Sequence, residues 1–275
     1  MSIQSRRAFF GTAIAAGAVV AACGEAKKRT TANVPVLHDQ APEGPPLKAG
    51  LVGCGGRGTG AALDFIDASP TCELVALGDV FQDKIDSCRA KLKEERDVEV
   101  PDANCFVGFD AYQKVIDSGI DVILLVTPPH FRAEHFAAAV AAGKHCFLEK
   151  PVGVDPVAVK KVIESAGQAR TKNLTVIAGT CWRHHKKVIE TYRRVAEGAI
   201  GDIVAAQSYF NTGQLWYRER QNDWSDMEWM IRDWVNWCWL SGDHIVEQHV
   251  HNLDTMSLYL GTTPVSYTHL RAHET

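Results

Sequence analysis

The sequence lacks the features that identify several common classes of protein. Its eight cysteines form no CxxC pair, which argues against a zinc ribbon or a redox motif. Its net charge is only −4, and it has no basic stripe or RNA-binding aromatic motif, so nucleic acid is not expected as the main partner. Beyond the first 22 residues no apolar run is long enough to cross a bilayer. With 46% hydrophobic and 23% charged residues, the composition is that of an ordinary globular protein.

The first 23 residues have the layout of an export signal. Arg6 and Arg7 precede phenylalanine and an Ala-rich apolar stretch, as in a twin-arginine signal. Residues 20–23 resemble a lipobox, with Cys23 as the lipidated first residue of the mature protein; the alternative is an ordinary cleavage site. The sequence thus predicts a signal peptide at 1–23, a flexible linker at 24–46, a periplasmic location and, with the lipobox, a lipid anchor through Cys23.

A glycine-rich hexapeptide, GCGGRG at residues 53–58, stands between a predicted strand at 47–52 and a predicted helix at 59–68. Asp79 follows Gly58 by 21 residues, at the end of a second apolar run. Strand, glycines, helix and acid together are the context of a dinucleotide-binding fingerprint. The alternative is a glycine-rich turn that binds nothing.

Each glycine of the hexapeptide has its own predicted role. Gly53 permits a tight turn, Gly55 lets the backbone approach a pyrophosphate, and Gly58 lets the helix pack close to the strand. The start of the helix then presents free N–H groups and a positive dipole end to the phosphates.

Strands and helices alternate from residue 47 to residue 180, the predicted NAD-binding Rossmann domain. Strands are predicted at 47–52, 73–78, 105–107, 121–126, 145–148 and 175–178, and helices at 59–68, 82–95, 111–117, 131–142 and 156–170. Such alternation predicts the α/β class, with a Rossmann-type doubly wound parallel sheet and right-handed crossovers.

The pattern changes near residue 181. A helix is predicted at 187–197 and a strand at 203–211, and six of the seven tryptophans fall between residues 216 and 239. This inventory predicts an incomplete α+β substrate and oligomerisation domain at 181–265. Residues 266–275 resemble a translated adapter sequence, so a non-native tail is predicted and the natural protein is expected to continue; a genuine polar tail is the alternative.

Polar residues follow two predicted strands at the sheet edge where doubly wound folds bind ligands. Glu149 and Lys150 end one strand, and Lys150 would face a nicotinamide ring unless it is an ordinary surface lysine. Thr127 and Pro128 end the preceding strand and face the same crevice. His130, in the same TPPH segment, either contacts the cofactor or caps the next helix.

A third polar cluster spans residues 242–254. If the segment is helical, Glu247, His251 and Asp254 share one face. Catalysis, structural hydrogen bonding and metal binding all remain open, although the segment does not match HExxH and no metal is predicted. Trp182 and Arg183 follow the last Rossmann strand and are candidate substrate contacts; for Arg183 the alternative is a domain-interface ion pair.

In this order the motifs GCGGRG with its following Asp, TPPH, EKP and GDHIVEQHVHNLD resemble the Gfo/Idh/MocA oxidoreductases over about residues 47–264. More narrowly, the chain resembles the exported bacterial branch of that family. The resemblance implies a Rossmann domain followed by an α/β domain whose open sheet supports homo-oligomer contacts. It also implies that a sugar, cyclitol or related polyol is oxidised or reduced with NAD or NADP.

The resemblance also implies roles for individual residues. Lys150 is the lysine of the EKP motif, His251 is the histidine of the second-domain helix, and Glu247 stands where the family usually has Asp. His251 would act as general base, and Lys150 would donate to the same substrate oxygen. Asp79 would accept hydrogen bonds from the adenosine ribose and repel a 2′-phosphate, which favours NAD over NADP. The full predicted cofactor-binding set is Gly53, Gly55, Arg57, Gly58, Asp79, Thr127, Pro128, His130 and Glu149.

Export and cofactor use together predict an unusual cycle. The periplasm offers no dependable pool of free nicotinamide cofactor, so an exported enzyme is expected to retain its cofactor and restore its redox state in each cycle. Two other functions fit the same residues. One is NAD-dependent glycoside hydrolysis through transient oxidation, and the other is a non-catalytic sugar sensor.

Overall fold

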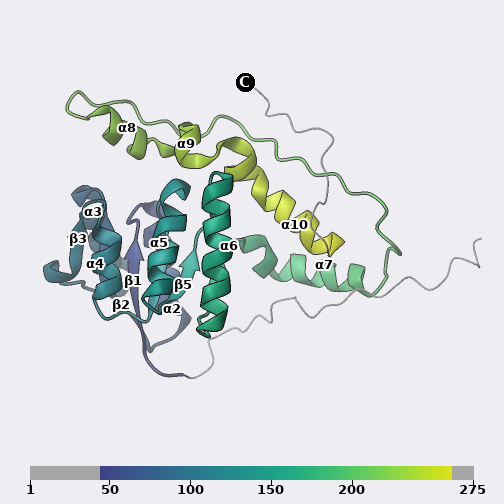
Figure 1. Ribbon diagram of the computed structural model, residues 1–275, viewed down its shortest axis with the longest axis horizontal. Helices are drawn as coiled ribbons and strands as arrows, with labels where there is room; N and C mark the ends of the chain where they lie inside the picture. The colour runs from purple at the N-terminus through teal and green to yellow at the C-terminus, as the bar shows by residue number, and fades with distance from the viewer. Residues whose placement is uncertain (1–43, 262–275) are drawn as a thin grey trace, which may run out of the picture.

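The structure is a computed structural model that describes residues 44–261 (Figure 1). The predicted signal peptide, nearly all of the predicted linker and the predicted tail lie outside the described residues. No helix among residues 44–261 combines the length and the apolar character needed to cross a membrane.

Six parallel strands form one sheet in the order β3-β2-β1-β4-β5-β6. They are β1 (Leu47–Val52), β2 (Cys72–Asp79), β3 (Cys105–Val107), β4 (Val122–Leu125), β5 (His145–Leu148) and β6 (Val176–Ala178). From the central strand β1 the chain passes to β2 and β3 on one side of the sheet, and then to β4, β5 and β6 on the other side. This order confirms the predicted Rossmann-type sheet and puts the ligand-binding crevice at the carboxyl ends of β1 and β4.

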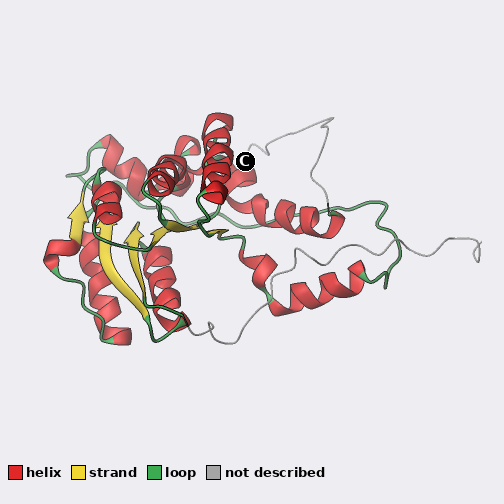
Figure 2. Ribbon diagram, turned by 60° about the horizontal axis from the view of Figure 1, so that its bottom comes forward, coloured by secondary structure: helices red, strands yellow, loops and turns green. Residues whose placement is uncertain are grey.

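Helices cover both faces of the sheet (Figure 2). They are α2 (Gly56–Ala68), α3 (Gln82–Arg96), α4 (Ala111–Asp117), α5 (Pro129–Ala141) and α6 (Pro156–Thr171). α2 packs on α3, and α5 packs on both α4 and α6. Two separate buried clusters match these two layers. One contains Leu63 and Ile85 of the α2–α3 layer, and the other contains Val115, Phe136 and Ala169 of the α4–α5–α6 layer.

Local chemistry explains why these elements form where they do. Ile123, Leu124 and Leu125 of β4 are all nearly inaccessible to solvent, as expected for a central parallel strand covered on both faces. α6 begins with Pro156, whose fixed φ suits the first helical position. The side chain of Asp155 caps this helix by accepting hydrogen bonds from the N–H groups of residues 157 and 158.

The region after β6 is helical and irregular. It contains η2 (Cys181–His184), α7 (Lys186–Ala196), α8 (Asp226–Arg232), η3 (Trp234–Asn236), α9 (Cys238–Ser241), the π-helix η4 (Ile245–His249) and α10 (Val250–Leu260). Tyr192 and Ala196 of α7 and Leu258 of α10 form a small third core. Figure 1 shows α8 and α9 running across the top of the Rossmann domain, with α7 and α10 to one side.

The strand predicted at residues 203–211 is wrong. Residues 201–221 adopt neither helix nor strand. A strand needs a neighbour for its backbone hydrogen bonds, and every strand among residues 44–261 belongs to the Rossmann sheet. Val204 and Tyr209 therefore stay exposed, at 95% and 72%. The weak alternation in this segment reflects no half-buried surface in the described part of the chain.

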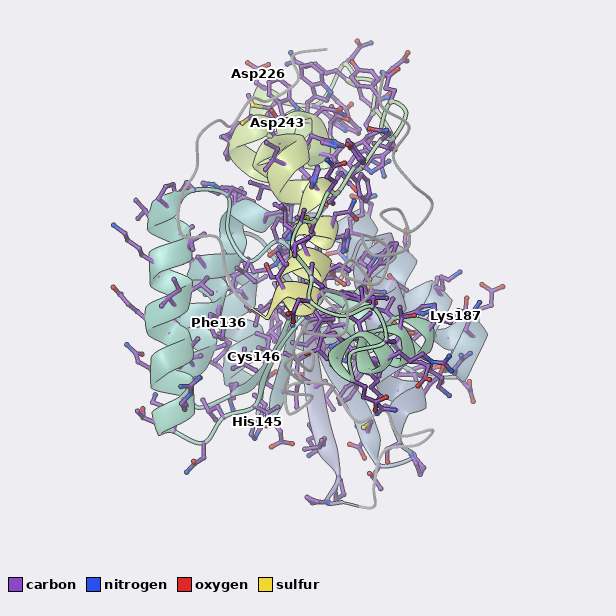
Figure 3. All side chains as sticks on the ribbon, turned by 90° about the vertical axis from the view of Figure 1, so that its right-hand side faces the viewer. Phe136, His145, Cys146, Lys187, Asp226 and Asp243 are labelled. Atoms are coloured by element: carbon purple, nitrogen blue, oxygen red, sulfur yellow. The ribbon has the colours of Figure 1, made fainter. Side chains whose placement is uncertain are left out.

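The C-terminal elements lie at the carboxyl edge of the sheet. β5 begins at His145, near the bottom of Figure 3, whereas Asp226 of α8 and Asp243 before η4 lie at the top. α9 packs on α5, and the ring of Trp239 meets that of His130 edge to face, with 5.1 Å between ring centroids. The region after β6 therefore covers the crevice in which a doubly wound sheet binds its ligand.

One helix of the Rossmann domain contains a buried histidine. His135 of α5 is 8% exposed and stacks on Tyr112, with ring centroids 4.1 Å apart. Burial, assisted by the nearby Arg132 cation, lowers the pKa of His135 to about 4. The imidazole is therefore neutral in the folded chain at neutral pH.

The lowered pKa of His135 predicts a loss of stability in acid. The stabilising contribution is complete above the unfolded-state pKa of about 6.5 and is lost as the pH falls towards 4. This difference corresponds to about 3 kcal/mol. We expect the free energy of unfolding in urea to fall by about this amount between pH 7 and pH 4, and His135→Phe to flatten the decrease. His184→Phe, at an exposed position, is the control. Equal pH dependence in His135→Phe and wild type would contradict the assignment.

Candidate functional site

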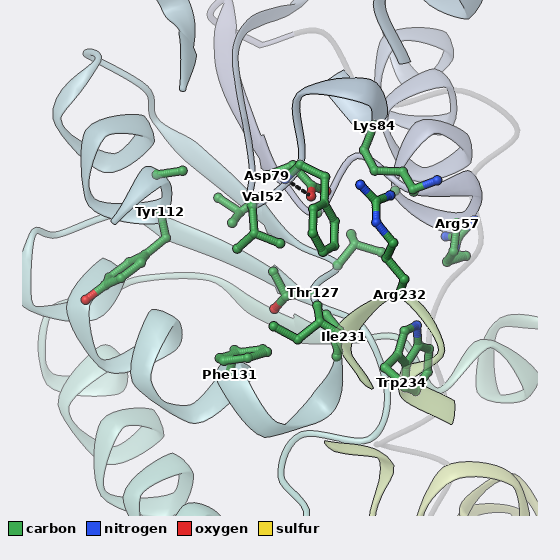
Figure 4. Close-up of a pocket in the computed structure, with 18 of the residues that line it drawn as sticks. Val52, Arg57, Asp79, Lys84, Tyr112, Thr127, Phe131, Ile231, Arg232 and Trp234 are labelled. Atoms are coloured by element: carbon green, nitrogen blue, oxygen red, sulfur yellow. Dashed lines mark hydrogen bonds between the residues drawn. The ribbon is translucent and has the colours of Figure 1, made fainter. Parts of the chain in front are cut away.

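A cavity of about 370 Å³ lies at the carboxyl edge of the sheet, beside the ends of β1, β2 and β4 (Figure 4). The glycine loop forms one part of its wall, and the turns after β2, β3 and β4 form another. Seven of the nine predicted cofactor-binding residues line it: Gly53, Gly55, Arg57, Gly58, Asp79, Thr127 and Pro128. Glu149 and His130 do not belong to the lining.

The glycines of the loop are required by space. Gly53 has φ +98°, and a Cβ there would stand 2.6 Å from the backbone carbon of Val126. A Cβ on Gly58 would stand 1.7 Å from the carbonyl oxygen of Gly53. A Cβ on Gly55, in contrast, would meet nothing within 4 Å, because this residue borders open space in the cavity. Gly53 and Gly58 thus shape the turn, and Gly55 leaves its backbone open to a ligand.

The start of α2 suits a phosphate. The helix begins at Gly56, three residues earlier than predicted, and no side chain caps it. Gly56, Arg57 and Gly58 of its first turn all line the cavity. The N–H groups of a first turn have no partner within the helix, and the helix dipole makes this end positive. The glycine loop and the open helix end therefore fit the pyrophosphate of a dinucleotide.

Asp79 lines the cavity at the end of β2 and is held by the backbone. Its Oδ2 accepts a hydrogen bond of 2.7 Å from the N–H of Cys54, and its Oδ1 accepts one of 3.0 Å from the N–H of Phe81. Burial raises the pKa of this carboxyl, and the two N–H donors act against that effect. Each oxygen retains a further lone pair with which it can accept from a hydroxyl.

Lys150 and Glu247 form a direct contact between the Rossmann domain and the C-terminal region. Lys150 Nζ donates to Glu247 Oε1 at 2.8 Å and to the Glu247 carbonyl oxygen at 2.6 Å. Glu247 is 6% exposed, and burial raises its pKa while the Lys150 cation opposes the rise. Its Oε2 is buried and has no hydrogen-bond partner among residues 44–261.

His251 belongs to the same cluster. It lies in the first turn of α10, directly after η4, which holds Glu247. Burial and then the charge of Lys150 lower the pKa of His251, so its imidazole favours the neutral form. Its Nδ1 is buried without a hydrogen-bond partner in the described part of the chain, and its ring centroid lies 6.4 Å from that of Trp182. The structure thus brings together Lys150 of the turn after β5, Glu247 of η4 and His251 of α10.

Two other predicted residues bind each other. Arg183 Nε lies 2.7 Å from both carboxylate oxygens of Asp254, an ion pair between η2 and α10. Both residues lie after β6, within the predicted second domain, so this pair is not the domain-interface ion pair that was the alternative for Arg183. Asp254 is thereby committed to Arg183. No group of three or more metal-ligating side chains within residues 44–261 is placed to hold a metal ion.

Glu149 and Arg57 also meet. Glu149 Oε1 accepts from Arg57 Nε at 2.6 Å, and its Oε2 accepts from the N–H of Lys150 at 3.0 Å. The pair ties the start of α2 to the end of β5, next to the cavity. His130, in the first turn of α5, packs against Phe131 and Trp239, and the cap position of this helix belongs to Pro128.

Sequence reasoning missed Arg132. Its side chain is almost fully buried and donates to the carbonyl oxygens of Thr127 and Pro151. Burial lowers its pKa to about 10, and the carboxylates of Glu247 and Glu149 act in the other direction. Arg132 thus fastens the turn after β4 to the turn that carries Lys150. In the sequence, the signal for this role is a single arginine near the start of an Ala-rich helix.

Sequence reasoning also missed the second wall of the cavity. Side chains from beyond residue 210 form this wall: Trp216, Arg218, Ile231, Arg232 and Trp234. Figure 4 shows Arg232 and Trp234 on the side of the cavity near Lys84 and Arg57. The concentration of tryptophan in this stretch was visible in the sequence, but spacing alone gave no reason to place it over the cavity.

Comparison with known proteins identifies relatives of this chain. Residues 47–179 match a family described as "Oxidoreductase family, NAD-binding Rossmann fold". The chain is 28% identical to an inositol 2-dehydrogenase of Paracoccus denitrificans, over 55% of this chain and 42% of that protein. It is 23% identical to a "Glycosyl hydrolase family 109 protein" of Streptomyces coelicolor, over 72% of this chain and 43% of that protein. The chain therefore spans less than half the length of these two curated relatives.

Solved structures share the fold. A scyllo-inositol dehydrogenase from Lactobacillus casei, solved with bound NAD(H) and scyllo-inositol, is similar with a TM-score of 0.56 and 22% identity, over 78% of this chain and 56% of that one. A myo-inositol 2-dehydrogenase from Lactobacillus plantarum gives a TM-score of 0.57 and 23% identity, over 78% of this chain and 57% of that one. At such identities the likeness shows a common fold.

The glycine geometry predicts a sharp difference between two substitutions. Gly58→Ala places a Cβ against a backbone oxygen that cannot move without opening the turn. We expect NAD⁺ affinity to fall at least about tenfold, a loss of about 1.4 kcal/mol or more. Gly167→Ala is the matched control, because this exposed glycine in the middle of α6 has open space for a Cβ and should gain about 1 kcal/mol of stability. Equal NAD⁺ affinity of the two variants in calorimetric titration would contradict the role of Gly58.

Proposed function

We propose that the protein is an NAD-dependent oxidoreductase of the Gfo/Idh/MocA family with a retained cofactor, because residues 47–179 match that family's NAD-binding Rossmann fold. Its substrate is a sugar, a cyclitol or a related polyol. The supporting observation is the cluster of Lys150, Glu247 and His251 at the carboxyl edge of the sheet that carries the dinucleotide cavity.

In this proposal the residues of the cluster divide the work on a substrate hydroxyl. His251, kept neutral by burial and by the neighbouring cation, removes the hydroxyl proton as general base. Lys150 donates a hydrogen bond to the same oxygen and stabilises the charge that develops there. Glu247 positions the ammonium group of Lys150 through its carboxylate and its carbonyl. The nicotinamide cofactor, when bound, supplies the hydride chemistry.

A preference for NAD over NADP is supported by the charges around Asp79. This buried carboxylate stands where a ribose 2′-hydroxyl is recognised in such folds, and a 2′-phosphate would meet its negative charge. Arg232, a cation in the same cavity, is already paired with Asp83 and Glu228. Lys84 also faces the cavity, 3.5 Å from Asp83.

The proposal includes export. The paired arginines of the leader favour passage of the folded protein to the periplasm with its dinucleotide bound, and the lipobox favours an anchor through Cys23. Assembly into a homo-oligomer is part of the same proposal. Mass spectrometry of the ligand released from the purified protein tests retention directly. NAD released in near-stoichiometric amount is the expected result.

A second candidate function has support from the Streptomyces coelicolor relative, which is described as a glycosyl hydrolase. Glycoside hydrolysis through transient oxidation would use the same lysine and histidine. A chromogenic glycoside, supplied without added cofactor, separates the two functions. Release of the chromophore would favour the hydrolase. If the glycoside stays intact and a free polyol is turned over with an added electron acceptor, the oxidoreductase is favoured.

Removal of the Lys150 ammonium group should abolish most of the turnover. For Lys150→Met we expect a fall in kcat of about 10²–10³-fold, the usual effect of losing one donor to a developing oxyanion. Loss of the Lys150 cation also removes an effect that lowers the pKa of Glu247, so the pKa of this carboxyl should rise further in the variant. Lys144→Met is the control, since Lys144 is also partly buried and donates to a carbonyl far along the chain. Unchanged kcat in Lys150→Met would refute the assignment, and unchanged ligand affinity without any wild-type turnover would indicate a sensor.

The lowered pKa of His251 predicts where activity declines in acid. As the pH falls, protonation of His251 removes the base, and because its pKa is lowered the midpoint should lie below the ordinary value of about 6.5. We expect this acidic limb in kcat/KM and its absence in the residual activity of His251→Ala. A midpoint above that value in the wild type would argue against His251 as the base.

A further inference from the structure

We propose that residues 216–236, here called the cap, close the adenosine end of the dinucleotide cavity, and that an ion pair between Arg232 and Asp83 latches the cap shut. The latch would set how long the dinucleotide stays bound. The inference rests on the proposed function, because it requires that the cavity hold a dinucleotide.

The cap is held together as one unit by Asp233. This residue is 1% exposed, and its Oδ1 accepts hydrogen bonds from the N–H of Arg218 at 2.8 Å and from Asn236 Nδ2 at 2.9 Å. Asn236 Nδ2 also donates to the carbonyl oxygen of Trp216, and Trp229 Nε1 donates to that of Arg218. The irregular segment at 216–225 is therefore expected to move together with α8 and η3.

The cap faces the adenosine end of the cavity. Ile231, Arg232 and Trp234 share the lining with Asp79 and Phe81, which follow β2. Figure 4 shows Arg232 beside the Asp79 region of the cavity. Since the ribose of adenosine is recognised at the end of β2, the cap covers that half of the ligand and not the half next to Lys150.

Arg232 joins the cap to the Rossmann domain. Its Nη2 and Nη1 lie 2.8 Å and 3.1 Å from the two carboxylate oxygens of Asp83, in the first turn of α3. Its guanidinium carbon also lies 3.8 Å above the ring of Phe81. The Arg232 cation lowers the pKa of Asp83, so the latch stays ionised at neutral pH. A bidentate pair of this kind with an aromatic face beneath it is specific to arginine.

Three of the five N–H donors of Arg232 are committed to carboxylates, which favours a latch over a phosphate reader. Nε donates to Glu228 at 2.9 Å, and both terminal nitrogens donate to Asp83. A 2′-phosphate at Arg232 would also stand beside the negative charges of Asp83 and Glu228. Opening of the latch, in contrast, releases the cap from α3 and uncovers the adenosine half of the cavity.

The test is the release rate of NADH from the full chain, followed by the decrease in NADH fluorescence in the presence of excess NAD⁺. Arg232→Ala should accelerate release at least about tenfold, because loss of a partly buried charge pair acts mainly on dissociation. Asp83→Asn, which breaks the same pair from the Rossmann side, should give a similar increase. The double variant should be no faster than the faster single variant, since both changes open one latch.

Arg96→Ala is the matched control. Arg96 also forms a bidentate pair, with Asp67 at 2.6 and 2.7 Å, outside the cavity lining. Its loss should leave NADH release unchanged. Two fragments separate a latch from general loosening: release of ADP-ribose should accelerate in Arg232→Ala, and release of reduced nicotinamide mononucleotide should not. Equal acceleration of both fragments would overturn the latch.

The outcomes also separate this inference from the proposed function. Wild-type release of NADH at the rate of Arg232→Ala would overturn the latch and leave the oxidoreductase intact. If Arg232→Ala lost more affinity for NADP⁺ than for NAD⁺, Arg232 would be identified as a phosphate reader. That result would also overturn the latch. A wild-type chain that binds no NADH would overturn the proposed function and the latch with it.

Discussion

The contact between Lys150 and Glu247 is the interaction on which the arrangement of the site depends. It joins the end of β5 to η4, across 97 residues of sequence, through two hydrogen bonds of 2.6 and 2.8 Å. Both groups are largely buried, so the loss of either partner would leave a charge without compensation in a poorly solvated place. The contact also brings the positive charge of Lys150 close enough to His251 to lower the pKa of that imidazole. This ion pair thus helps to hold the C-terminal region on the Rossmann domain, and its cation adds to the effect of burial on the pKa of His251.

The sequence predicts the Rossmann half well because its signals are local. A buried strand, three spaced glycines and a following acid constrain residues that are neighbours along the chain, and the structure has Gly53 and Gly58 where only glycine fits. The contacts that complete the site are not local. Asp83 and Arg232 are 149 residues apart, and no periodicity relates them. The pairing of Arg57 with Glu149 could not be predicted either, because both residues were plausible ligand contacts one by one. The strand at 203–211 failed for the complementary reason: alternation predicts a strand only where a neighbouring strand exists.

Buried charge is concentrated on the side of the sheet edge where β4 and β5 end. Arg132 holds the carbonyls of the two turns, while Glu149 and Glu247 lie near enough to raise its pKa against the effect of burial. Removing charged groups from water is costly, and here the cost is offset by mutual compensation among one arginine, one lysine and two glutamates. Such a network favours a single arrangement of the turns. The network makes the Lys150 end of the cavity rigid. The adenosine end is instead covered by the cap, which the ion pair between Arg232 and Asp83 holds to α3.

The π-helix at Ile245–His249 places a limit on how this protein can vary. A π-turn holds more residues than an α-turn, and such turns occur often at functional sites. Deletion of one residue there would restore α-helical spacing and rotate everything beyond it by about 100°. His251 would then point away from the ammonium group that Glu247 holds, although every side chain of the cluster would still be present. The number of residues between Glu247 and His251 is therefore as strictly constrained as the identity of these two residues.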